Sequence, residues 1–251
     1  MKVRYIILFL VLVLVFGFGL FTSCRAEEII EESAEEEITE PVEEEIVEES
    51  IEEPAEEKIV EEIVEEKPVE EPEPEPIILS GSGDSVVDIE KPDKAMVVHI
   101  IGNKSSNHFA VINYDKEGER IELLVNTTES YDGIRPLDFE NGEWTSRFEI
   151  NASGSWTIEV LPLSSLRILS VPGSIKGKGD EVFLLMDDIP DLAKITGNAK
   201  SNHFAVLGYN GGRDLLVNTT EPYEGTVILN KSTFIIEVIA VDNWAIEVCA
   251  K

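Results

Sequence analysis

Hydrophobic and polar residues alternate with a period of two over residues 77–251. Trp156, Ile158 and Val160 alternate with Thr157 and Glu159, and the pattern returns as Trp-Ala-Ile-Glu-Val over residues 244–248. Such alternation is typical of a β-strand with one buried face. No helical period extends over a dozen residues here. We therefore predict that this part of the chain consists of short strands.

The same region contains an internal repeat. Ser-Asn-His-Phe-Ala-Val at 106–111 returns unchanged at 201–206, and Leu-Leu-Val-Asn-Thr-Thr-Glu at 123–129 returns at 215–221. Gly-Ser-Gly-Asp at 81–84 corresponds to Gly-Lys-Gly-Asp at 177–180. The motifs keep their order, which indicates a duplicated unit. The predicted domain organisation is a signal peptide over 1–23, an anchor and linker over 24–78, and repeats over 79–166 and 167–251.

Turn residues separate the predicted strands, such as Asn210-Gly211 in the second repeat. Many short strands between turns favour an all-β fold of two tandem antiparallel β-sandwiches, each similar to a jelly roll. We expect Trp156 and Trp244 to occupy equivalent core positions. The order of the repeated motifs also loosely resembles the pre-peptidase C-terminal type of jelly roll found in secreted bacterial proteins. That resemblance implies a fold and supplies no catalytic motif.

The N-terminus has the layout of an export signal. Lys2 and Arg4 precede an apolar run that ends near Leu20. The following Phe21-Thr22-Ser23-Cys24 resembles the lipobox of bacterial lipoproteins, in which a small residue precedes the cysteine. The resemblance implies cleavage before Cys24 and acyl chains of the palmitate kind anchored there, which would hold the chain to a membrane. The alternative is an uncleaved membrane helix, and both place the remaining residues outside the cytoplasm.

Charge divides the rest of the chain in two. Residues 27–76 contain 25 Glu and two Lys, whereas residues 77–251 have a net charge of −11. Prolines at 41, 54 and 68 interrupt any helix, and neighbouring glutamates repel each other. We predict that residues 24–78 form a disordered acidic linker. No basic patch suggests nucleic acid as a partner.

Four residues are the candidates for ligand contact. His108 and His203 are equivalent in the two repeats, and alternation places them on the strand face of Ala110 and Ala205, where we expect histidines of the core. Tyr131 and Tyr223 lie beside glycines and are candidates for exposed aromatic contacts with a sugar or peptide; the alternative is a structural role for both tyrosines.

Neither a metal site nor a catalytic site is predicted. Asp84 and Asp180 fit turn-capping residues, with a calcium loop as the alternative. No Gly-x-Ser-x-Gly nucleophile motif occurs, and no cofactor motif was found. The sequence therefore favours a lipid-anchored cell-envelope protein that displays two non-catalytic modules for binding a surface glycan or protein. A structural or oligomerisation role in the envelope is the alternative, ahead of a hydrolase.

Overall fold

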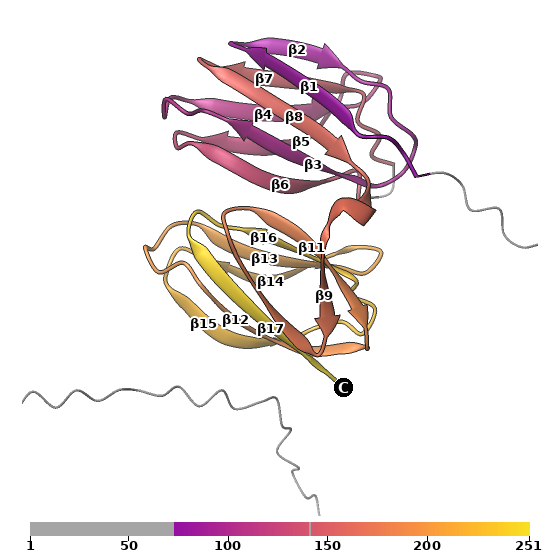
Figure 1. The fold of residues 1–251 in the computed structure, drawn as a ribbon, viewed down its shortest axis with the longest axis vertical. Helices are drawn as coiled ribbons and strands as arrows, with labels where there is room; N and C mark the ends of the chain where they lie inside the picture. Colours follow the sequence, from indigo (N-terminus) through magenta and orange to yellow (C-terminus); the bar gives the residue numbers. More distant parts are fainter. Residues whose placement is uncertain (1–72, 141) are drawn as a thin grey trace, which may run out of the picture. The chain divides into compact units, whose positions relative to one another are not determined.

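The computed structural model describes residues 73–140 and 142–251, drawn in colour in Figure 1. The predicted signal peptide, the anchor at Cys24 and nearly all of the acidic linker lie outside these residues. Within the described residues, no helix is long and apolar enough to cross a membrane.

The first repeat is a two-sheet sandwich of eight strands. Its sheets have the orders β1-β8-β3-β6 and β2-β7-β4-β5, and all the pairs are antiparallel. This order defines a jelly roll, in which strands from both ends of the repeat lie side by side. The strands are β1 Ile77–Ser82, β2 Ser85–Asp88, β3 Met96–Gly102, β4 Phe109–Tyr114, β5 Arg120–Thr127, β6 Tyr131–Leu137, β7 Arg147–Ala152 and β8 Ser155–Leu161.

The second repeat has the same strand order and one additional strand. Its sheets are β10-β17-β12-β15 and β14-β13-β16-β11-β9. The additional β9 follows a short 3-10 helix, Leu163–Ser165, and pairs with β11 in parallel. The predicted all-β fold of tandem sandwiches is thus confirmed, with β9 as an exception to antiparallel pairing. The strands are β9 Arg167–Val171, β10 Gly173–Lys178, β11 Glu181–Asp187, β12 Pro190–Gly197, β13 Phe204–Tyr209, β14 Arg213–Thr219, β15 Tyr223–Ile228, β16 Ile235–Ile239 and β17 Asn243–Ala250.

The repeated Gly-x-Gly-Asp motif has a packing role in each sandwich. The Trp156 ring lies directly over Gly81, where any Cβ would clash with it. Its indole Nε1 donates a hydrogen bond to the carbonyl of Gly83, 3.1 Å away, and Asp84 accepts one from the amide of Ala152. This last bond reaches the end of β7 and does not close the aspartate's own turn, so the turn-capping interpretation stays a prediction. The second repeat makes the same contacts with Gly177, Gly179, Asp180, Ala240 and Trp244.

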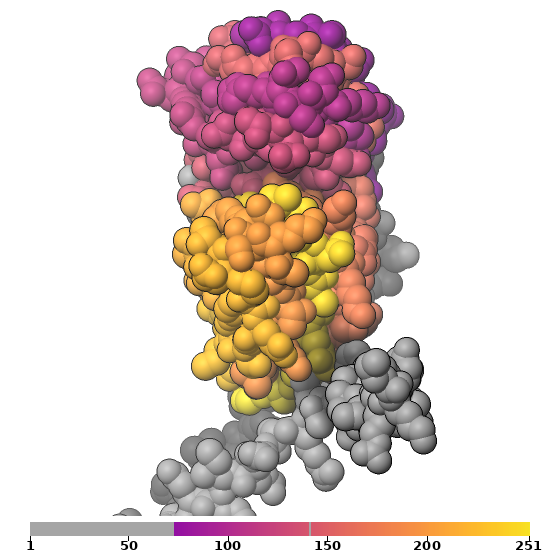
Figure 2. Space-filling model, turned by 90° about the vertical axis from the view of Figure 1, so that its left-hand side faces the viewer, coloured from indigo at the N-terminus to yellow at the C-terminus, as the bar shows by residue number. Residues whose placement is uncertain are grey.

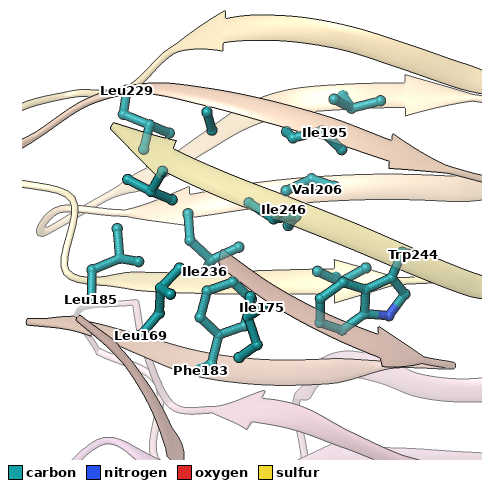
Figure 3. Packing of buried hydrophobic residues seen from close by; sticks show 14 of the residues in the cluster. Leu169, Ile175, Phe183, Leu185, Ile195, Val206, Leu229, Ile236, Trp244 and Ile246 are labelled. Carbon is teal, nitrogen blue, oxygen red and sulfur yellow. The ribbon is translucent and has the colours of Figure 1, made fainter. Parts of the chain in front are cut away.

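Each sandwich has its own hydrophobic core between its two sheets. Trp156 and Trp244 are both buried in it, as predicted, and Phe183 stacks on Trp244 with ring centroids 6.0 Å apart. Figure 3 shows Ile175 and Phe183 close to Trp244, with Ile195, Val206 and Ile246 extending the cluster. Apolar burial of this kind is the main stabilising contribution in a small domain.

A third apolar cluster joins the two repeats. Val97 and Leu161, on the outer face of β3 and β8, pack with Val182, Leu207 and Ile235 on the outer face of β11, β13 and β16. In the space-filling view the atoms of the two repeats lie directly against each other (Figure 2). Both faces of the β14-β13-β16-β11-β9 sheet are therefore covered at its centre, and all six residues of β13 are buried.

The equivalent outer face of the first repeat is more polar at three positions. Asp88, Arg147 and Asn151 occupy the positions that Leu184, Ile235 and Ile239 hold in the second repeat. Polar residues at these three positions suit a face in contact with water, and apolar ones suit a covered face. The two copies have thus diverged according to which face each one buries.

Candidate binding groove

A groove of about 960 Å³ lies between the repeats. The first repeat supplies His99, the end of β5 (residues 123–127) and residues 129–135. The second supplies the turn at 178–181, His203 and residues 239–241. The groove mixes aliphatic surface with exposed polar and charged side chains, and its volume is within the usual range for ligand sites.

A buried ion cluster forms part of the groove wall. The Arg135 guanidinium of β6 is 6% exposed and lies 3.1 Å from a carboxylate oxygen of Glu237 in β16, which is 1% exposed. The other oxygen of Glu237 accepts a hydrogen bond of 2.6 Å from the Tyr209 hydroxyl. Tyr131 donates one of 2.7 Å to Asp180, which also lies 3.6 Å from Arg135. The cluster therefore links the two repeats.

Burial controls the electrostatics of this cluster. It raises the pKa of Glu237 above the usual range, although the nearby Arg135 acts in the opposite direction. Burial would lower the pKa of Arg135, but Glu237 and Asp180 outweigh it, so this pKa is raised and the guanidinium stays charged. The hydrogen bonding of the cluster is incomplete, since Arg135 Nε and Glu237 Oε1 have no hydrogen-bond partner among the described residues. A single cation thus holds two carboxylates of the second repeat.

His99 is a second titratable group of the groove. Its Nδ1 lies 3.0 Å from Glu159 and its Nε2 lies 2.8 Å from Asp132. Burial lowers the pKa of His99, but the hydrogen bonds to Asp132 and Glu159 outweigh it, so the pKa lies above the usual value. The repeat-equivalent residue is Lys194.

This arrangement predicts a pH-dependent stability. Because the pKa of His99 is higher in the folded state, its contribution is complete below the unfolded value near 6.5 and is lost as pH rises through the folded value. Urea unfolding of the full chain at several pH values should show this decline. The substitution His99→Lys should remove it, because lysine keeps its charge in this range. An unchanged pH profile in the variant would contradict the assignment.

The structure corrects the expectation for His108 and His203. Both histidines are exposed and lie just before β4 and β13, and they are not core residues. The inward face of β4 is that of Phe109 and Val111, so the face that includes Ala110 points outward. Each histidine Nε2 lies 3.2 Å from an asparagine Oδ1, in Asn126 or Asn218.

The two tyrosines are partly enclosed, which supports the structural alternative over an exposed contact. Each is partly buried and packs on a core phenylalanine, with ring centroids 6.4 Å apart for Tyr131 and Phe109 and 6.3 Å apart for Tyr223 and Phe204. Tyr131 and His203 line the groove, whereas Tyr223 lines a separate hollow of about 520 Å³ beside Trp244. The four candidate residues therefore do not form one site.

Sequence reasoning missed Arg135 and Glu237. Arg135 occupies the position of Val227 in the second copy, on the inward side of its strand. Glu237 has two apolar residues on each side of it in Ile-Ile-Glu-Val-Ile. A charge within a run of buried residues is expected only where a partner compensates for it. Two features of the sequence could have revealed the cluster: Arg135 stands where the second copy has Val227, and Glu237 lies within an apolar run.

Comparisons with known proteins add little. No protein-family model matches the chain, and no curated protein matches it. Among solved structures, the protein YhaK from Escherichia coli is 12% identical over 69% of this chain and 84% of its own, with a TM-score of 0.23. A regulatory subunit of a cAMP-independent protein kinase A from Trypanosoma cruzi, bound to guanosine, is 8% identical over 69% and 72%, with a TM-score of 0.21. Scores this low carry no argument about fold or ligand.

Proposed function

We propose that this chain is a lipid-anchored bacterial cell-surface protein that binds an extended uncharged or cationic ligand in the groove between its repeats. The observation that carries the proposal is that both repeats wall this groove. A groove that needs both repeats gives a reason for holding them together through a buried ion cluster. The proposed role is binding without catalysis.

Charge restricts the class of ligand. Exposed Glu129, Asp132 and Lys178 line the groove, and residues 77–251 have a net charge of −11. Such a surface repels polyanions, including nucleic acids and strongly acidic glycans. A neutral glycan or an uncharged to cationic peptide segment fits both this charge and the mixed polar and aliphatic lining.

Blocking the groove tests the proposal. Val241 lines it and is 51% exposed, so Val241→Arg adds bulk and charge without disturbing a core. The full chain is screened on an array of neutral and acidic oligosaccharides and on a panel of neutral and cationic peptides. The variant should weaken binding of the best neutral or cationic probe at least about tenfold, which corresponds to 1.4 kcal/mol.

A matched control is Ile228→Arg, because Ile228 is 77% exposed on β15 and does not line the groove. This variant should bind like the original chain. Equal binding by all three proteins, or binding of acidic probes alone, would contradict the proposal.

The anchor is tested separately at Cys24. Cys24 and Cys249 are the two cysteines of the sequence. One sulfur cannot carry both a thioether-linked lipid and a disulfide, so the chemical state of Cys24 shows whether the chain is lipid-anchored. Mass spectrometry of the mature N-terminal peptide should find it starting at Cys24 with acyl chains attached. A retained signal sequence, or Cys24 in a disulfide, would refute the anchor.

A further inference from the structure

Each repeat exposes the same small group of polar side chains. His108, Asn126 and Thr128 are exposed in the first repeat, and His203, Asn218 and Thr220 are exposed in the second. The histidine–asparagine distance is 3.2 Å in both copies. The two surface groups are thus identical in residue type and matched in geometry.

The fold explains the residues around these groups. Asn103 Nδ2 donates to the backbone carbonyls of Asn107 and Glu129, and Asn198 makes the same bonds with Asn202 and Glu221. These bonds fasten the loop to the following strand end, so the fold needs an asparagine at this position in both copies. The side chains of the exposed histidine, asparagine and threonine residues make no such hydrogen bonds to the backbone.

Other exposed positions of the repeats have changed freely. Lys104, in the same loop as His108, corresponds to Ala199, and Ser82 corresponds to Lys178. Exposed residues usually tolerate substitution, so polar residues kept on the surface of diverged copies point to binding. The two copies began as identical sequences, and other exposed positions have since diverged. Common origin alone therefore does not explain why these polar residues are still the same.

We propose that each repeat carries one matched sugar-binding site, built on the pair His108–Asn126 in the first repeat and the pair His203–Asn218 in the second. With Asn Oδ1 as the acceptor, His Nε2–H is the donor, which leaves His Nδ1 to accept and Asn Nδ2 to donate. Together with the threonine hydroxyl they match neighbouring sugar hydroxyls, which both donate and accept.

This inference rests on the proposed function and narrows it to a neutral glycan. Asn126 of the first pair and His203 of the second line the groove, so one residue of each pair borders it. Two sites on one chain also strengthen attachment to a repetitive glycan through avidity.

The experiment is a calorimetric titration of the full chain with the best neutral oligosaccharide from the array. The original chain should bind two molecules. Asn126→Ala and Asn218→Ala should each leave one site, and the double variant should bind at least about tenfold more weakly or not at all. The control Lys104→Ala, which gives the first loop the alanine of the second, should leave both sites intact. All variants should unfold at the same urea concentration, since the substituted side chains are exposed.

The outcomes separate this proposal from the proposed function. If the double variant binds like the original chain while Val241→Arg does not, the paired sites are refuted and the groove stands. If no neutral oligosaccharide binds but an uncharged or cationic peptide does, the sugar class is refuted and the groove again stands. If neither class of probe binds, both proposals fail.

Discussion

Replacing Arg135 with methionine should destabilise the folded repeats by about 3–5 kcal/mol, because it leaves the carboxylate of Glu237 buried without its cation. Methionine keeps much of the side-chain volume, so the loss reflects charge more than packing. Urea unfolding of the full chain measures the effect. Adding Glu237→Gln to Arg135→Met should recover part of the loss, since the uncompensated charge is then removed.

The matched control is Arg147→Met. Arg147 also pairs with an aspartate, Asp88 at 2.6 Å, but this pair is at the surface. Solvent screens an exposed pair, so the substitution should cause no measurable change. If Arg135→Met cost no more than Arg147→Met, the buried cluster would have no role in joining the repeats.

Replacing Trp244 with alanine should destabilise the chain by about 3–5 kcal/mol, the usual range for removing a buried tryptophan. The change leaves a cavity beside Phe183 and removes the hydrogen bond from the indole to the Gly179 carbonyl. Calorimetric or urea unfolding measures it. Trp244→Phe should cost less than Trp244→Ala, because it keeps part of the ring and loses the hydrogen bond.

Trp144 provides the comparison for this prediction. It is 42% exposed and its ring lies 5.7 Å from the Lys91 ammonium. Trp144→Ala should therefore cost far less than Trp244→Ala. Similar losses for the two substitutions would show that Trp244 is not the core residue described above.

Period-two alternation was enough to predict the strands and the core tryptophans. In β8 and β17 one face is apolar and the other contains polar residues such as Thr157 and Glu159, so the inward side was unambiguous. The turns also followed from local chemistry, since residues 115–119 join β4 to β5 and residues 210–212 join β13 to β14.

Alternation failed where both faces of a strand are apolar. In β4, Phe109 and Val111 alternate with Ala110 and Ile112, so the pattern does not say which pair points inward. The misplaced histidines follow from that ambiguity. Alternation also could not predict the packing between the repeats, because this packing depends on which copy's outer face is covered. Comparing Ile235 with Arg147 across the copies would have indicated the answer.

The shared groove depends on the two repeats forming one folded unit. Native-state hydrogen exchange at the Ile134 amide probes this, because that amide donates to the Asp180 carbonyl across the repeats at 3.1 Å. In one folded unit this amide should exchange as slowly as the amides of the central strands β3 and β13, that is, only on global unfolding. Exchange as fast as in an exposed loop, with β3 and β13 still protected, would show that the repeats separate and do not form one unit.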